Sequence, residues 1–266
     1  MGAERIAALL EHARAVGRTA LLPFMTAGLP DPETSPGIFR AMAEAGADAF
    51  EVGIPYSDPI MDGPVIHEGS RRALRAGTDL ARAFGVVEAV GAVTGKPILV
   101  MTYANPVFRV GPEEFCRLVV EAGGDGLIVP DLPVEEASEV RAAAEEAGLG
   151  MVLFLAPTSD GRRLRAVAEA RPVFIYGVAD LGVTGERAEA SSRAGELAER
   201  VRAVTDLPLV LGVGISTPDQ ARAVAEVADG VIVGSALVRR VLEAGSAEEA
   251  GRSAGRAVAD LAAALH

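Results

Sequence analysis

Two carboxylates stand out because of where they lie in the sequence. Glu51 falls inside the apolar run AFEVGI (49–54), and Asp62 falls in the polar stretch IPYSDPIMDGPVIHEG (54–69) that follows it. A charged side chain inside a buried strand is costly unless it faces a functional opening. Two carboxylates in different environments can share acid and base work without a metal or an amine. The alternatives are a structural ion pair for Glu51 and turn formation for Asp58 and Asp62, which precede Pro59 and Gly63.

Other reactive side chains are few. The three histidines are His12, His67 and His266, and their spacing is not that of metal ligands. The single lysine, Lys96, precedes the apolar run PILVM, which places it at the start of a strand and away from the expected active end. The single cysteine, Cys116, lies in the helical pattern EEFCRLVVEAG, which favours a buried, unreactive thiol. The sequence therefore predicts no metal site and offers no obvious Schiff-base lysine.

Three glycine-bearing motifs follow apolar runs late in the chain. They are GVTG (182–185), GVGIS (212–216) and VGSA (233–236). A phosphate needs backbone N–H groups that approach closely, and glycine removes the Cβ that would block this approach. The alternative for each motif alone is a tight turn. Three in order favour a phosphate site, in which Ser235 would add a hydroxyl group at a helix N-terminus.

The elements that must position these residues alternate regularly. Short apolar runs at 20–25, 49–54, 98–103, 126–130, 151–156, 173–178, 209–213 and 230–234 are separated by Ala/Glu/Arg-rich stretches of helical period. Eight such repeats predict an α/β fold, a single (β/α)₈ TIM barrel over residues 1–266 with an extra N-terminal helix. An open, doubly wound sheet is the alternative. The barrel is favoured because residues with chemical potential follow several different strands.

Composition excludes several function classes. The net charge is −12, and no cluster of basic residues is present, which argues against nucleic-acid or anionic-membrane binding. No apolar stretch is long enough to span a bilayer, and the N-terminus lacks the apolar core of a signal peptide. We expect a cytoplasmic protein.

Two further features suggest ligand contact. The tyrosines Tyr56, Tyr103 and Tyr176 lie at or just after predicted strand ends, although core filling is an equal alternative. The long polar connection at 179–195 predicts a lid, with a disordered insertion as the alternative.

The motifs together resemble a known family. LPFMTAGLPD, FEVGIPYSDPIMDGP, MTYANPVF, DGLIVPDLPVEE, GVTG, GVGIS and VGSALV occur in this order over essentially the whole chain, which resembles the tryptophan synthase alpha chain family. The FEVGIPYSDPIMDGP block is highly specific, and the glycine motifs are less so.

The resemblance implies a lyase that cleaves indole-3-glycerol phosphate to indole and glyceraldehyde 3-phosphate. Glu51 matches the acid/base, Asp62 matches the carboxylate that binds the indole N–H, and Thr184 matches the residue that closes the lid. The expected substrate-binding residues are Phe24, Tyr103, Ile128, Tyr176, Thr184 and Val213. The expected phosphate-binding residues are Gly185, Gly214, Gly234 and Ser235.

The same resemblance implies a partner. The family works with a PLP-dependent beta subunit in an alpha2-beta2 heterotetramer, and the alpha chain itself carries no cofactor. The residues expected to face the partner are Asp58, Pro59, Asn105, Pro106, Asp131 and Pro133.

Some positions depart from the family pattern. Leu29 replaces a common Asp, His67 a common Gln and Val213 a typical Phe, and VADLG (178–182), which includes Asp180, replaces a Ser-x-Ala-Gly type segment. These changes leave two alternatives open, a stand-alone lyase of a secondary pathway and a weakly catalytic subunit that binds and activates a beta chain. A different phosphate-binding barrel, such as a sugar-phosphate epimerase, is the alternative at the level of the fold.

Overall fold

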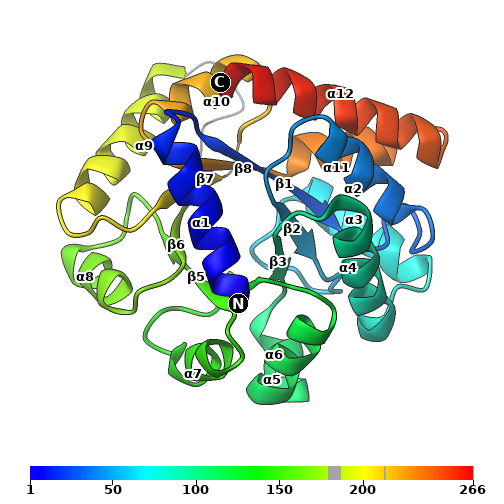
Figure 1. Ribbon diagram of the computed structural model, residues 1–266, viewed down its shortest axis with the longest axis horizontal. Helices are drawn as coiled ribbons and strands as arrows, with labels where there is room; N and C mark the ends of the chain where they lie inside the picture. Colours follow the sequence, from blue (N-terminus) through cyan, green and yellow to red (C-terminus); the bar gives the residue numbers. More distant parts are fainter. Residues whose placement is uncertain (179–186, 213, 266) are drawn as a thin grey trace.

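The chain folds into a closed parallel barrel of eight strands in sequential order, β1 to β8 (Figure 1). The computed structural model describes residues 1–178, 187–212 and 214–265, with the side chains of 187–192 left aside. The strands are β1 (Ala20–Thr26), β2 (Phe50–Gly53), β3 (Ile98–Met101), β4 (Gly126–Ile128), β5 (Gly150–Leu155), β6 (Phe174–Val178), β7 (Leu209–Gly212) and β8 (Gly230–Val233). The barrel expected from the sequence is confirmed, and the strand bounds differ from the apolar runs by at most two residues.

Helices surround the barrel (Figure 1). They are α1 (Gly2–Ala15), α2 (Ser35–Glu44), α3 (Pro64–Arg75), α4 (Leu80–Thr94), α5 (Ala104–Val110), α6 (Pro112–Glu121), α7 (Ser138–Glu146), α8 (Gly161–Glu169), α9 (Arg187–Arg202), α10 (Pro218–Ala225), α11 (Ser235–Glu243) and α12 (Ala247–Leu265). Among the described helices, none is long and apolar enough to cross a membrane.

Local sequence signals explain several helix starts. Thr217 caps α10 by accepting a hydrogen bond from the Gln220 backbone N–H, with Pro218 in the first helical position. Asp31 and Pro32 would be typical of a helix start, but α2 does not begin there. The Asp31 carboxylate instead accepts hydrogen bonds from the backbone and hydroxyl of Thr34, and the helix begins at Ser35.

Side-chain direction in the barrel follows from strand register. Phe24 of β1 lies opposite Glu51 of β2, and Tyr176 of β6 lies opposite Phe154 of β5 and Val210 of β7. Residues paired in register point to the same face of a sheet. Burial, and then the charge of Glu51, raise the pKa of Tyr176, which lies four strands away around the closed barrel. Together with the register, this places both side chains on the interior face.

The N-terminal helix closes the floor of the barrel. In Figure 1, α1 runs across the end of the barrel at which the strands begin. Gly2 packs so closely on the backbone of Asp125 that an added Cβ would lie 2.6 Å from its carbonyl oxygen. Arg5 and Arg14 of this helix pair with Asp125 and Asp229, which directly precede β4 and β8. The extra N-terminal helix predicted from the sequence is confirmed. It covers the end of the barrel at which the strands begin.

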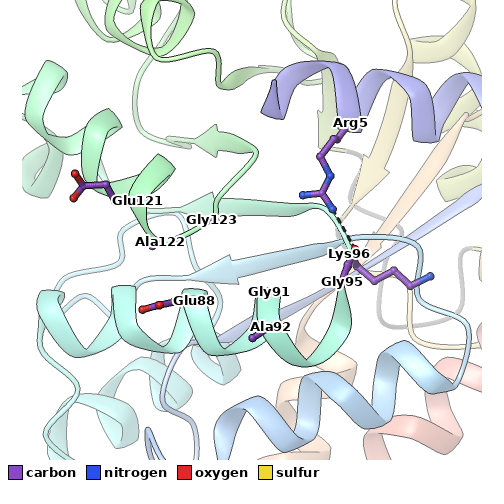
Figure 2. Close-up of a pocket in the computed structure, with 9 residues that line it drawn as sticks. All are labelled: Arg5, Glu88, Gly91, Ala92, Gly95, Lys96, Glu121, Ala122 and Gly123. Atoms are coloured by element: carbon purple, nitrogen blue, oxygen red, sulfur yellow. Dashed lines mark hydrogen bonds between the residues drawn. The ribbon is translucent and has the colours of Figure 1, made fainter.

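The single lysine lies at this same end. Lys96 lines a shallow pocket of about 270 Å³ together with Arg5, Glu88 and Glu121, between the last turns of α4 and α6 (Figure 2). Arg5 reaches across it to donate a hydrogen bond to the Gly95 carbonyl at 3.1 Å. The expectation that Lys96 lies opposite the active end is confirmed, so this pocket has no part in the chemistry described below.

The single cysteine is buried between helix and barrel. Cys116 of α6 is free, and burial raises the pKa of its thiol to about 11. A thiol with so high a pKa is protonated at neutral pH and is a poor nucleophile. The burial expected for Cys116 is confirmed.

Candidate active site

Glu51 is the most unusual ionisable group of the interior. It is 3% exposed, and its Oε2 atom has no hydrogen-bond partner among the described residues. Burial, and secondarily the nearby Asp62 carboxylate, raises its pKa to about 8. A carboxyl group with that pKa is mostly protonated at neutral pH, so Glu51 can donate a proton and then accept one.

Asp62 reaches the same region from the loop between β2 and α3. Burial raises its pKa to about 6, while a hydrogen bond from the Tyr103 hydroxyl and the charge of His67 oppose the rise. The Tyr103 hydroxyl also accepts a hydrogen bond from the Met61 backbone N–H at 3.2 Å, which fixes the loop beside Asp62. At neutral pH Asp62 is mostly ionised, so the two carboxyl groups hold different protonation states.

Tyr176 forms the wall of the interior opposite Glu51. Burial, and then the charges of Glu51 and Asp62, raise the pKa of its hydroxyl well above the usual range, so the group stays neutral. The ring packs against Gly212, where an added Cβ would lie 2.3 Å from the Tyr176 hydroxyl oxygen. Only glycine leaves room for this ring at the end of β7.

An aromatic residue that the sequence analysis missed joins this wall. Phe154 stacks on Tyr176 with ring centroids 4.8 Å apart, and it is the only half-exposed position in the otherwise buried strand β5. Its register with Tyr176 places it on the interior face. The signal was available, because Phe154 is the aromatic residue of the run MVLFLA near a strand end.

Phe24 connects the interior to the predicted phosphate end. An added Cβ on Gly53 would lie 2.7 Å from the Phe24 ring, and one on Gly234 would lie 3.5 Å from Phe24. Ile128 of β4 is fully buried and in register with the interior residue Met101 of β3. Phe24, Ile128, Tyr176 and Glu51 thus lie on the interior face, and Tyr103 borders it beside Asp62.

The glycine-bearing strand ends that the structure describes have the geometry of an anion cradle. Gly234 caps α11, and Ser235 is the first residue of that helix and is exposed. Backbone N–H groups at a helix N-terminus attract anions. Gly214 has a positive φ of 80°, a conformation that favours glycine. Thr184, Gly185, Val213 and the Asp180 position lie outside the described residues.

The loops after β2, β3 and β4 form one connected rim. The Asn105 side-chain amide donates to the Tyr56 hydroxyl at 2.8 Å, and Tyr56 stacks on Tyr103 at 5.3 Å between ring centroids. Asp131 accepts a hydrogen bond from the Ala104 backbone N–H at 2.9 Å. These contacts tie the three loops together beside Asp62.

The residues expected to face a partner differ in exposure on this rim. Asp58, Asn105 and Pro133 are exposed, Pro106 and Asp131 are half-buried, and Pro59 is buried. Three apolar side chains that the sequence analysis missed are also exposed here: Ile60 at 78%, Met61 at 59% and Phe108 at 46%. Clustered exposed apolar residues mark surfaces that contact other molecules.

No metal-binding group is present in the described part of the chain, since no three His, Cys, Asp or Glu side chains lie together there. The arrangement brings two carboxyl groups with raised pKa values together beside the stacked rings of Phe154 and Tyr176, with a helix N-terminus following β8.

Comparison with known proteins identifies close relatives. The family profile described as tryptophan synthase alpha chain matches residues 10–265. The chain is 46% identical over 250 residues to the tryptophan synthase alpha chain of Streptomyces avermitilis, covering 94% of this chain and 90% of the relative. It is 48% identical over 240 residues to that of Salinispora tropica, covering 90% of each.

Solved structures agree. A tryptophan synthase structure from Mycobacterium tuberculosis superposes with a TM-score of 0.89 at 41% identity and covers 98% of both chains. The tryptophan synthase alpha chain of Legionella pneumophila superposes with a TM-score of 0.87 at 33% identity, covering 98% of this chain and 97% of that one.

Proposed function

Because this chain belongs to the tryptophan synthase alpha chain family and is a lyase of tryptophan biosynthesis, we propose that Glu51 and Asp62 are its catalytic pair. The proposed reaction cleaves indole-3-glycerol phosphate into indole and glyceraldehyde 3-phosphate. The observation that carries the assignment is the buried Glu51 carboxyl group, whose Oε2 atom has no partner among the described residues and whose pKa of about 8 is raised by burial and by the nearby Asp62 carboxylate.

The chemistry divides between the two carboxyl groups. Protonated Glu51 gives its proton to C3 of the indole ring, and the ring develops positive charge that ionised Asp62 stabilises through the indole N–H. The bond between C3 and the glycerol chain then breaks, and its electrons return to the ring. The adjacent hydroxyl becomes the aldehyde and passes its proton to the Glu51 carboxylate, which restores the starting state.

The remaining site residues hold the substrate. Phe24, Ile128, Tyr176 and Phe154 offer apolar and aromatic surface to the indole ring, and we assign Tyr103 to positioning Asp62. The N-terminus of α11, with Gly234 and Ser235, and the positive-φ Gly214 supply the phosphate end. We keep Thr184, Gly185 and Val213 in the proposed site on the strength of the family resemblance alone.

A beta chain is the proposed partner. The solved relatives from Mycobacterium tuberculosis are tryptophan synthase structures, which implies a beta partner for the family. The rim that carries Ile60, Met61 and Phe108 beside Asp58, Asn105 and Pro133 is the proposed contact face. We propose an alpha2-beta2 heterotetramer whose PLP belongs to the beta chain, acting in the cytoplasm, with this chain as one domain.

Indole release from indole-3-glycerol phosphate by the purified chain tests the proposal, alone and then with a tryptophan synthase beta chain and serine. Slow release that rises strongly with the partner is the expected result. Fast release that the partner leaves unchanged would make the chain a stand-alone lyase. No release in either condition would overturn the catalytic assignment and leave a binding subunit or another substrate.

A further inference from the structure

The helix that follows Asp62 and the helix that bears the phosphate cradle lie side by side. Figure 1 shows α3 and α11 as neighbours on one side of the barrel. The helix α3 begins at Pro64, two residues after Asp62, and α11 begins at Ser235. Both helices follow strands of a parallel barrel, so their first turns lie at the active end and their last turns lie toward the floor.

Three contacts run down the length of this pair. At the active end, the Ile66 side chain lies 3.7 Å from where a Cβ on Gly234 would be. In the middle, Gly69 approaches Val238 so closely that an added Cβ would lie 3.0 Å from the Val238 side chain. At the far end, the Arg72 guanidinium donates a hydrogen bond to the Leu242 carbonyl at 3.0 Å.

The spacing of these contacts has a geometric meaning. The positions on α3 advance by three residues, and those on α11 advance by four. A ridge of i±3 residues packed into a groove of i±4 residues gives nearly parallel helices that can slide only by losing contacts. The pair therefore behaves as one rigid unit with the catalytic loop and the phosphate cradle at the same end.

Arg72 is the polar clasp of this unit. The Leu242 carbonyl lies in the last turn of α11, where carbonyls lack an intrahelical donor and where a positive charge suits the helix dipole. Glu68 holds the clasp in place, because its carboxylate accepts a 3.0 Å hydrogen bond from Arg72. The same carboxylate accepts a bidentate pair from Arg71, for which no contact to α11 is found among the described residues.

We propose that Arg72 is a positioning residue of the lyase reaction, which fixes Asp62 relative to the phosphate cradle by clasping α3 to α11. This inference rests on the proposed roles of Asp62, Gly234 and Ser235. Phosphate held at the first turn of α11 then places the indole N–H at the Asp62 carboxylate, because the two helices cannot shift against each other.

Steady-state cleavage of indole-3-glycerol phosphate by Arg72→Gln, with Arg71→Gln as the matched control, tests the clasp. We expect Arg72→Gln to lower kcat about fivefold, the scale of one ordinary hydrogen bond at an exposed position, with KM changed less than kcat. Arg71→Gln should stay within twofold of the wild type in both constants. Arg72→Lys, which keeps a donor within reach of the carbonyl, should recover part of the loss.

A double-mutant cycle with Ser235→Ala tests the coupling itself. If the clasp works through the phosphate helix, the kcat loss from Arg72→Gln should shrink in the Ser235→Ala background. Equal losses in both backgrounds, or an Arg72→Gln variant as active as Arg71→Gln, would overturn the inference while leaving the proposed function intact. An unchanged KM in Ser235→Ala alone would instead remove the phosphate assignment, and the inference with it.

Discussion

The buried carboxyl groups at the two ends of the barrel differ in their hydrogen-bond partners. At the floor, both carboxylate oxygens of Asp125 accept hydrogen bonds from one guanidinium nitrogen of Arg5, each at 2.9 Å, and Oδ2 also accepts from the Ile98 backbone N–H at 2.9 Å. Asp229 is paired with Arg14 and Arg202 and accepts from the Leu209 backbone N–H at 2.8 Å. At the active end, the Glu51 carboxyl oxygen Oε2 is buried with no partner in the described structure.

The partners of the floor aspartates follow one repeated arrangement, which Glu51 does not share. Asp48 repeats the floor arrangement, since it pairs with Arg18 and accepts from the Leu21 backbone N–H. In all three cases an aspartate just before a strand accepts a hydrogen bond from a backbone N–H at the start of the neighbouring strand and pairs with an arginine of or near α1.

Such partners oppose the effect of burial on a carboxyl group. At Asp229 they outweigh burial and lower the pKa, at Asp125 burial still outweighs them and raises the pKa, and at Glu51 burial raises the pKa to about 8. Burial alone therefore does not distinguish Glu51 from the aspartates of the floor, whereas its buried oxygen atom without a partner in the described structure does.

The largest expected effect is on the active end. Glu51→Gln should lower kcat by at least about a hundredfold, because the variant can neither donate nor accept the proton. Its stability should not fall, since the wild-type group is already neutral when buried. Steady-state cleavage and thermal unfolding of the same preparation would check both. Near-normal turnover would remove Glu51 from the mechanism.

Asp62→Asn should also reduce kcat by about a hundredfold. The amide cannot stabilise the positive charge that develops on the indole nitrogen, although it fits the same space. Binding of the product indole, measured by calorimetry, should change less than kcat. A variant that loses affinity and turnover in equal measure would instead make Asp62 a binding group only.

Asp229→Asn should show the reverse pattern at the floor. The substitution leaves Arg14 and Arg202 without their shared carboxylate, at an expected cost of about 1–3 kcal/mol in the free energy of unfolding. Because Asp229 lies at the opposite end of the barrel from Glu51, kcat should stay within twofold of the wild type. Urea unfolding and cleavage kinetics test the contrast, and a large loss of kcat in a folded variant would contradict it.

The smallest expected effect is a difference in the sign of pH dependence. Burial would raise the pKa of Asp229, but hydrogen bonds from Arg14, Leu209 and Arg202 outweigh it and lower the pKa overall. The stabilisation of the fold by ionised Asp229 is thus fully present above the pKa that Asp229 has in the unfolded chain, and it is lost as the pH falls through the lower pKa of the folded chain. The raised pKa of Glu51 acts oppositely, so its stabilisation is lost as the pH rises from about 4.5 to about 8.

Unfolding of the wild type and of Glu51→Gln across that pH range isolates the Glu51 contribution. The wild type should lose stability relative to the variant between pH 5 and 8, by on the order of a few kcal/mol at most. Parallel stability curves would show that Glu51 is ionised in the folded protein and that the contrast between the two ends is wrong.

Much of this molecule was predictable from its sequence because the signals are local. Alternation of apolar runs with helical stretches predicted the barrel. Glu51 was recognised as unusual because it is a charged residue within an apolar strand. Its lack of a partner among the described residues was not predictable, since this depends on which side chains the seven other strands turn inward. The hydrogen bond from Arg72 to Leu242 was missed for the same reason, because it joins residues far apart in the chain. Phe154 could have been found as an aromatic residue near a strand end, but its stacking on Tyr176 could not.

The most direct test is the pKa of Glu51 itself. Carbon-13 NMR of side-chain carboxyl groups in protein labelled at glutamate, assigned by loss of one signal in Glu51→Gln, would follow its titration in the folded chain. The account predicts a midpoint near pH 8, set by burial and by Asp62. A midpoint near 4.5 would show an ordinary ionised carboxylate and would contradict the proposal that Glu51 delivers the proton.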